Sequence, residues 1–259
     1  MRPRVAAWML MALFLPMLGL AQRGPKRPPQ AKSQQEYAAY NTGRAATGGT
    51  SLEAAASDFA VKYPESELRL YLYSKAMHAY QSENNPAKML AMGERVLALD
   101  PDNSVALALT ATVLADGLNE TDPDRAQKAA QIKQDGTRAL KTLDSDLVFA
   151  PGVTPEEISA YKALLKVMVH SALGIMELKT GNDSGAEKEL KAAAGLNATG
   201  DPSVYYHLAL AQDHQKKYAQ ALASVEQALQ LASFSPDLQQ LAESEHERLQ
   251  KLARREPPR

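Results

Sequence analysis

The chain has 259 residues, 45% of them hydrophobic and 23% charged, with a formal net charge of −1 and no cysteine. A net charge this close to zero excludes a global positive field that attracts nucleic acid or an acidic membrane surface. The absence of cysteine excludes disulfides and a thioether lipid anchor. With only four Phe and one Trp, the core must be built largely from Ala and Leu, which favours helices packed through small residues.

Residues 1–21 have the pattern of a secretory signal peptide. Arg2 and Arg4 give a basic start, residues 5–20 carry no charge, and small residues lead up to a cleavage point after Ala21. The uncharged run is shorter than the ~20 residues that span a bilayer comfortably. We therefore expect export to the periplasm or cell envelope. The alternative is an uncleaved inner-membrane anchor formed by residues 5–20.

Residues 22–32 combine three Pro with four basic side chains. Such a segment buries little surface, so we expect an extended, solvated linker; docking on an anionic surface is the alternative. A helical repeat domain is predicted over residues 33–255, and residues 256–259 are expected to form a disordered tail.

About eleven helices and no strand are predicted in the repeat domain, because apolar residues recur with helical spacing between Gly, Pro and Asn breaks. The predicted helices cover 34–46, 51–63, 65–84, 87–99, 104–116, 125–143, 155–180, 184–196, two helices within 205–232, and a last one from 236. Their starts are predicted from capping residues: Ser33 with Glu36, Thr50 with Glu53, Asp122 before Pro123, Thr154 with Pro155 and Glu157, and Asp183 or Ser184.

A repeat underlies the last part of the domain. Residues 170–197 align with residues 205–232 at a constant shift of 35. The aligned pairs are Leu173 with Leu208, Gly174 with Ala209, Ala186 with Ala221, Leu190 with Val225, and Ala193 with Ala228. A period of this size, with two helices in each unit, predicts a solenoid of stacked helix pairs.

These residues resemble the tetratricopeptide repeat (TPR) family, here in an exported bacterial protein. That pattern places an aromatic residue, Leu-Gly and a Tyr on the first helix, and Ala, a large apolar residue, Ala and Pro on the second. The clearest units are 70–103, 167–201 and 202–235. The signature residues are Tyr73, Tyr80, Pro101, Leu173, Gly174, Ala186, Leu190, Ala193, Tyr205, Leu208, Ala209, Tyr218, Ala221, Val225 and Ala228.

The resemblance implies an all-α, right-handed superhelical solenoid of antiparallel helix pairs with a C-terminal capping helix. Two helices approach closely where one presents Gly or Ala and the other a large side chain, so Gly174 predicts a contact too tight for a methyl group. Leu208→Ala is expected to destabilise the fold by roughly 2–5 kcal/mol. The helical run 155–180 is longer than an ordinary first helix and predicts a local departure from the superhelix.

In the TPR family the concave side of the solenoid binds extended or helical peptides. The matching positions here are Tyr71, Ser74, His78 and Gln81; Val105, Ala108, Thr112 and Ala115 in a weaker unit; Met168, Ser171, Ile175 and Leu178; and Ser203, Tyr206, Leu210 and Asp213. Because this lining is mostly apolar or small, it suits an amphipathic helix or an apolar peptide. Residues 155–163 or the terminal helix are alternative occupants from the chain itself.

No catalytic motif is present. His207 and His214 could share a helix face with Asp213, but a metal site needs three or four ligands and usually a pair at i and i+4, so no metal is expected. We therefore expect a non-enzymatic protein–protein interaction scaffold of the periplasm or envelope. It is expected to have a protein or peptide partner and no cofactor, metal, nucleic acid or small-molecule substrate. The alternatives are a structural subunit of an envelope or outer-membrane assembly complex and, more remotely, a small α-helical enzyme.

Overall fold

The computed structural model describes residues 27–196, 200–231 and 236–254. The predicted signal peptide at 1–21, the first residues of the linker and the tail at 256–259 lie outside the described residues.

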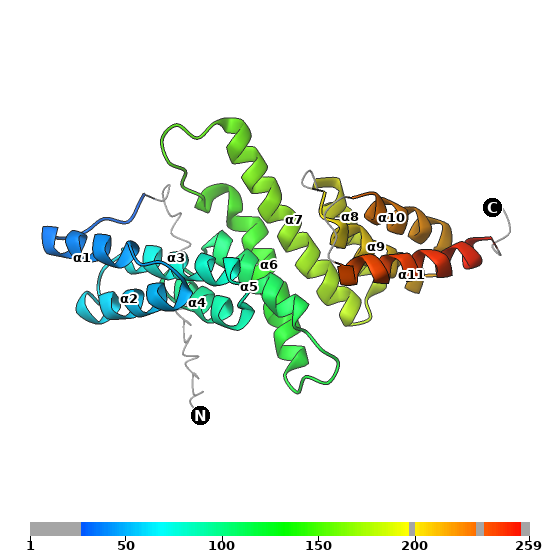
Figure 1. Cartoon of the computed structure of the whole chain (residues 1–259), viewed down its shortest axis with the longest axis horizontal. Coiled ribbons are helices and arrows are strands. Elements are labelled where there is room, and N and C mark those ends of the chain that lie inside the picture. Colours follow the sequence, from blue (N-terminus) through cyan, green and yellow to red (C-terminus); the bar gives the residue numbers. More distant parts are fainter. Residues whose placement is uncertain (1–26, 197–199, 232–235, 255–259) are drawn as a thin grey trace, which may run out of the picture.

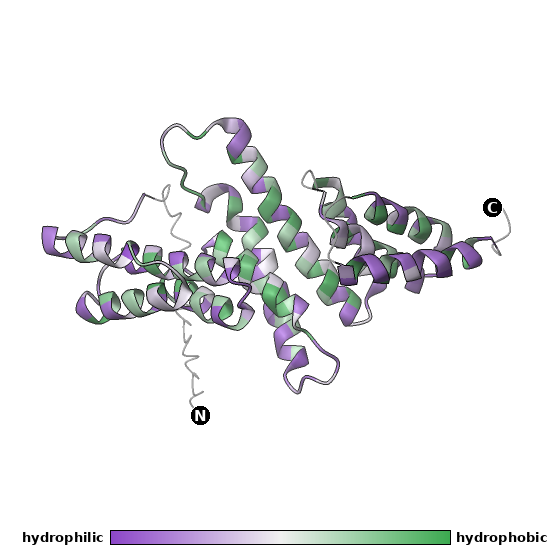
Figure 2. Cartoon of the chain, in the orientation of Figure 1, coloured by the Kyte–Doolittle hydropathy of each residue, from purple (hydrophilic) through white to green (hydrophobic). Residues whose placement is uncertain are grey.

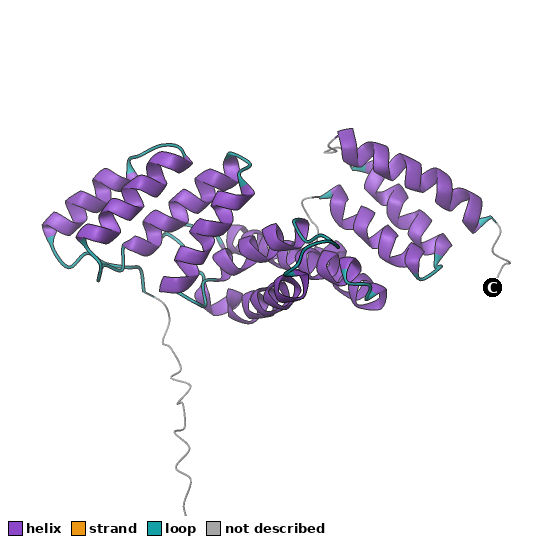
Figure 3. Cartoon of the chain, turned by 90° about the horizontal axis from the view of Figure 1, so that it is seen from below, coloured by secondary structure: helices purple, strands orange, loops and turns teal. Residues whose placement is uncertain are grey.

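Eleven α-helices and no strand occur in the described part of the chain, as the periodicity predicts (Figures 1 and 3). They are α1 (Gln34–Arg44), α2 (Gly49–Lys62), α3 (Arg69–Ser82), α4 (Pro86–Leu99), α5 (Ser104–Asp116), α6 (Arg125–Asp146), α7 (Pro155–Lys179), α8 (Asp183–Leu196), α9 (Pro202–His214), α10 (Tyr218–Gln230) and α11 (Pro236–Ala253).

Two of the predicted helix starts are confirmed by their hydrogen bonds. Thr154 forms the full capping box with Glu157, in which each side chain accepts a hydrogen bond from the other residue's backbone N–H. Ser33 accepts from the Glu36 N–H, but the Glu36 carboxylate reaches back to the N–H of Lys32. Both segments therefore begin their helices where the sequence signals place them.

Three predicted helix starts are wrong. Helix α2 begins after Gly48, and Glu53 accepts hydrogen bonds from Tyr80 and Lys88 of the next two helices instead of capping α2. Helix α6 begins after Asp124, without a side-chain cap. At α8 the side chain that accepts from the first turn is that of Asn182. At α2 a tertiary contact takes the expected capping residue, and at α8 a neighbouring residue serves as the cap.

The helices pack in series, each against the next along the chain. The odd-numbered helices also contact one another at α1 and α3, α5 and α7, α7 and α9, and α9 and α11. Figure 1 shows an elongated molecule in which α6 and α7 cross the long axis between two end groups, α1–α4 and α8–α11. Seen from below, both end groups rise on the same side of this centre (Figure 3). The predicted all-α solenoid of antiparallel helix pairs is confirmed.

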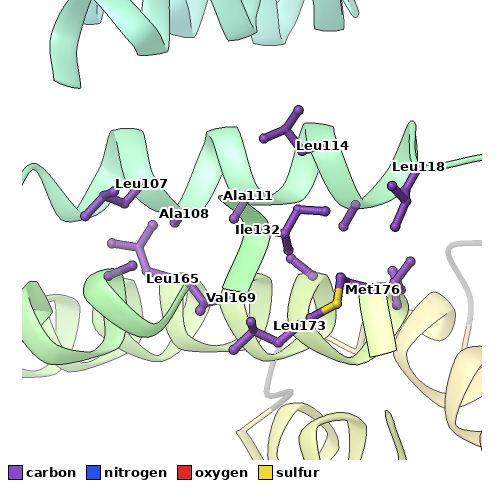
Figure 4. Close-up of a cluster of buried hydrophobic side chains, with 14 of the residues drawn as sticks. Leu107, Ala108, Ala111, Leu114, Leu118, Ile132, Leu165, Val169, Leu173 and Met176 are labelled. Atoms are coloured by element: carbon purple, nitrogen blue, oxygen red, sulfur yellow. The ribbon is translucent and has the colours of Figure 1, made fainter. Parts of the chain in front are cut away.

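The largest buried cluster joins α5, α6 and α7 at the centre of the molecule. Figure 4 shows Leu107 and Ala111 of α5 facing Val169 of α7, with Ile132 of α6 beside them. Figure 2 shows green, hydrophobic residues along α5 and α7. By length and composition α7 could cross a membrane, but here it packs against α5, α6 and α8, as a core helix of a globular protein does.

Glycines set the closest helix contacts. A Cβ atom at Gly174 of α7 would lie 2.5 Å from Cγ of Leu190 on α8, so the tight contact predicted from the sequence is present. At Gly136 of α6 the nearest side-chain atom, from Leu173, would lie 2.9 Å away. Real Cβ atoms do not approach other atoms this closely, so each glycine lets a large neighbouring side chain reach the helix backbone.

Most signature residues are buried where the repeat pattern predicts. Tyr80 is 2% exposed, and Leu190, Ala193 and Val225 are fully buried. Tyr205 and Tyr218 are only half-buried, and Pro101 is exposed in the turn after α4. The buried positions carry the packing of the stack, whereas Pro101 serves to end a helix.

A buried carboxylate ties α8 to the α9–α10 turn. Glu187 is 6% exposed and accepts hydrogen bonds from Lys217 Nζ at 2.6 Å and Gln215 Nε2 at 2.9 Å, and Lys191 Nζ lies 2.7 Å from its second oxygen. Burial alone would raise the pKa of Glu187, but these donors outweigh burial and lower that pKa from 4.5 to about 2.

The ionised form of Glu187 therefore stabilises the fold above about pH 4.5, and this stabilisation is lost as the pH falls from 4.5 towards 2. We expect Glu187→Gln to lower the free energy of unfolding at pH 7, by at most on the order of 3 kcal/mol, and to flatten its pH dependence below 4.5. Urea unfolding at several pH values measures both. Glu120→Gln, at an exposed loop position, is the control, and an equal effect there would contradict the assignment.

The Gly174–Leu190 contact predicts a non-additive pair of substitutions. Gly174→Ala is expected to cost roughly 1–3 kcal/mol through overpacking, and Leu190→Ala roughly 2–5 kcal/mol through the cavity it leaves. The double variant should cost less than the sum, because the truncated residue makes room for the new methyl group. Urea unfolding followed by circular dichroism measures all three. Gly195→Ala, with open space around it, is the control and should cause no loss.

Candidate functional site

A hollow of about 630 Å³ lies between α3, the start of α5, the loop 147–154 and the first turns of α7. We call it the α3 hollow. Its wall is mainly apolar and aromatic, formed by Leu70, Tyr71, Met77, Val105, Leu147, Val148, Phe149, Val153 and Tyr161, with Pro28 and Pro29 at one side. Its polar residues are Arg27, Ser74, His78, Asn103, Asp146 and Glu157. A lining of this kind buries apolar groups of a ligand and offers a few hydrogen bonds.

The hollow exists because α3 and α5 do not close on each other. Among the described helices, α1 contacts α3 and α5 contacts α7, whereas any contact between α3 and α5 is slight. The space between them is walled instead by the loop after α6. Phe149 from this loop stands edge-on to Tyr161 of α7, with ring centroids 6.1 Å apart, so the long N-terminal part of α7 holds the loop in place.

A row of aromatic rings leads from the hollow onto α1. The ring of Tyr71 lies 6.5 Å from that of Tyr40, which lies 6.4 Å from that of Tyr37. Tyr71 is 38% exposed and Tyr37 54%, so the row is open to solvent on one side. Burial, with a smaller contribution from Tyr40, raises the pKa of Tyr71, and the phenol is uncharged near neutral pH.

The acidic groups of the hollow are engaged in holding helix starts. Asp146 accepts hydrogen bonds from Ser104 N–H at 2.7 Å and from its hydroxyl at 2.9 Å, at the start of α5. Glu157 accepts the Thr154 N–H at 2.8 Å in the capping box of α7. These carboxylates therefore position the walls of the hollow.

The first predicted group of groove residues reaches this hollow. Tyr71, Ser74 and His78 of α3 line it, together with Val105 of α5. Gln81 lies outside the lining and hydrogen-bonds to His78 Nδ1 at 3.2 Å. The other α5 positions do not contribute to the hollow: Ala108 and Ala115 are buried in the central cluster, and the Thr112 hydroxyl donates to the Ala108 carbonyl.

The predicted groove positions on α7 do not form an open surface. Ile175 is 8% exposed within the central cluster, and Met168 packs between that cluster and the N-terminal one. Leu178 packs against the α8–α9 cluster, and the Ser171 hydroxyl oxygen is buried without a hydrogen-bond partner. The prediction fails here because α7 is enclosed by α5, α6 and α8, so that its inward face is core.

Two of the four predicted groove positions on α9 contact α11. Tyr206 packs against the cluster that contains Ala242 and Leu249 of α11, and Asp213 forms an ion pair with Arg248 at 2.5 Å. Ser203 hydrogen-bonds to the capping carboxylate of Asp201, and Leu210 is half-buried. The terminal helix thus covers part of the predicted surface at this end, one of the two self-contacts that the sequence left open.

Several residues of the hollow were not predicted. Phe149, Val148 and Leu147 come from the stretch "DLVFAPGV", which has no helical spacing, and Tyr161 comes from the part of α7 that exceeds the repeat. The sequence signal that could have found them is the run of apolar residues in an irregular loop, because such side chains tend to be buried against other parts of the protein. Tyr37 and Tyr40 belong to a helix that lies before the first clear repeat unit.

The two histidines considered for a metal site have separate hydrogen-bond partners. His207 Nδ1 lies 2.8 Å from the Ser203 carbonyl, and burial lowers the pKa of His207. His214 pairs with Asp183 of α8 at 2.9 Å. In the described part of the chain no group of three or more His, Cys, Asp or Glu residues could hold a metal ion.

No family model matches the chain, and no curated protein matches it. A similar solved structure is that of a thermophilic TPR protein from Thermus thermophilus, with 17% sequence identity and a TM-score of 0.46. The similarity covers 81% of this chain and 98% of that one. Function is therefore inferred from the geometry of the chain itself.

Proposed function

We propose that this chain is a non-enzymatic scaffold for protein–protein interaction, and that it binds a peptide or helix of its partner in the α3 hollow. The observation that carries the proposal is the lining: apolar and aromatic side chains from three separate helices and a loop surround one open space. An apolar partner side chain inserted there gains roughly 25 cal/mol for each Å² removed from water.

The aromatic row extends the proposed surface beyond the hollow. Tyr71, Tyr40 and Tyr37 present ring faces and edges in a line from the hollow to α1. Tyrosines are effective in protein interfaces because they combine a large rigid apolar area with a hydroxyl group that can remain hydrated. A partner segment that fills the hollow can therefore continue along α1.

Three observations favour binding over catalysis. The carboxylates of the hollow hold helix starts, the phenol of Tyr71 is neutral, and His78 is exposed with Gln81 as its neighbour. An active site would instead bring titratable groups together in a cleft around a reacting atom. The arrangement supports a scaffold.

A photo-crosslinking residue placed at position 78 tests the proposal in the native host. We expect His78 replaced in this way to crosslink to a distinct polypeptide, and the same residue at Val61, 84% exposed on α2, not to do so. Adding Tyr71→Ala should abolish the crosslink with little loss of stability, because Tyr71 is 38% exposed. The same polypeptides at both positions, or a crosslink that survives Tyr71→Ala, would count against the α3 hollow.

We also propose that the chain is exported to the periplasm or cell envelope. The basic start, the uncharged run 5–20 and the small residues before position 22 support removal of residues 1–21. Amino-terminal sequencing of the protein from its host should then begin at Gln22. A sequence that begins at Met1 in the membrane fraction would instead indicate an uncleaved anchor.

A further inference from the structure

The basic, proline-containing segment Arg27–Lys32 lies along the start of α3. We call this segment the arm. Arg27 forms an ion pair with Glu67 at 2.8 Å, and the Gln30 N–H points to the same carboxylate at 3.4 Å. Lys32 Nζ donates to the Glu65 carbonyl at 2.8 Å. The arm has no helix or strand of its own, and these contacts hold it against the turn that leads into α3.

The arm separates two hollows. Arg27, Pro29 and Leu70 line both the α3 hollow and a second one of about 370 Å³, whose other charged residues are Glu65, Glu67, Asp100 and Arg69. Because the same arm residues form a wall of each, departure of the arm would join the two spaces. The result would be one longer surface, apolar on the side of Tyr71 and acidic on the side of Glu65 and Glu67.

The two ends of the arm are held unequally. At the Lys32 end, the backbone N–H donates to Glu36 at 2.6 Å, and Glu36 is 3% exposed and also accepts from Ser66. Ala31 packs against the N-terminal core cluster. At the other end, the side chains of Arg27 and Glu67 are 62% and 44% exposed. An ion pair this exposed is weak and screened by salt, so the arm can open from Arg27 while Lys32 stays anchored.

The contacts of the arm show which chemistry the surface accepts. The two prolines have no N–H groups, so they lie against protein without leaving donors unsatisfied, and they favour an extended backbone. The guanidinium of Arg27 meets a carboxylate, and the ammonium of Lys32 meets a carbonyl oxygen. A segment with basic residues around prolines therefore matches this surface in both shape and charge.

We propose that the arm is an internal ligand. The surface along the start of α3 binds basic, proline-containing extended segments of another polypeptide, and the chain's own residues 27–32 occupy it until such a segment displaces them. The proposal rests on the proposed function in that the joined surface is part of the partner's binding site. It adds the chemistry of one part of that partner and a competition that limits access.

The test uses the full chain and a fluorescent peptide with the sequence of residues 24–32, GPKRPPQAK. Arg27→Glu removes the ion pair and repels Glu67, so this variant should bind the peptide about tenfold more tightly than the unmodified protein, whose arm competes. Lys188→Glu on α8, a lysine whose side chain is 83% exposed, makes the same change of charge elsewhere and should leave the affinity unchanged. Fluorescence anisotropy measures each dissociation constant.

Two further measurements identify the site. Glu67→Gln added to Arg27→Glu should weaken peptide binding without restoring the ion pair, and a peptide with its three basic residues replaced by Glu should not bind. Equal affinity of the Arg27→Glu and Lys188→Glu proteins, or binding that is undiminished by Glu67→Gln, would overturn the proposal. So would a dimer of the unmodified protein in sedimentation that Arg27→Glu dissociates, since the surface would then hold the arm of a second copy.

The outcome separates this inference from the proposed function. If the peptide fails to bind while the crosslink at position 78 still depends on Tyr71, the α3 hollow binds a partner and the arm is only structural. If the peptide binds to the Arg27→Glu protein while no crosslink forms at position 78, the surface along α3 is a binding site and the scaffold proposal for the hollow is the one that fails.

Discussion

Close approach of neighbouring helices through glycine is the contact on which the rest of this structure depends. Gly93, Gly136 and Gly174 each leave no room for a methyl group against a side chain of the following helix. With few aromatic residues and no disulfide available, the stack gains its stability from many such interlocking contacts between small and large residues. Each contact fixes the distance and the angle of one helix on the next, and the sum of these angles gives the chain its curved, elongated form (Figure 3).

The same packing explains why the α3 hollow lies beside the N-terminal end group. The 25-residue helix α7 is longer than its neighbours, and its inner half fills the centre with core side chains. Its outer half extends past α5 and holds Phe149 through Tyr161. The loop 147–154 therefore stands off from the stack and faces α3 across a space that α5 does not fill. The departure from a regular superhelix, rather than the regular repeat, makes the hollow.

The local parts of this structure could be predicted from the sequence, and the long-range parts could not. Helix positions follow from apolar spacing and from caps such as Thr154 with Glu157, and the contact of Gly174 follows from a glycine placed inside a helix. The groove positions on α7 and α9 were misjudged because their exposure depends on which other helices cover them. A repeat pattern assigns the same face to every unit, whereas enclosure by α6 or α11 differs from unit to unit.

The two ends of the solenoid differ in how firmly their inner surface is covered, and this difference locates function. At the C-terminal end, α11 buries Leu249 and Ala242, and Arg248 bridges Asp213 and Glu245, so uncovering α9 would expose apolar core. At the N-terminal end, the covering element is the arm, which is held at its tip by a solvated ion pair and inserts no large apolar side chain into the core. Removing α11 would cost a substantial part of the folding free energy, whereas lifting the arm costs little. The surface along α3, and not the surface under α11, is therefore the one at which the partner segment we propose would compete.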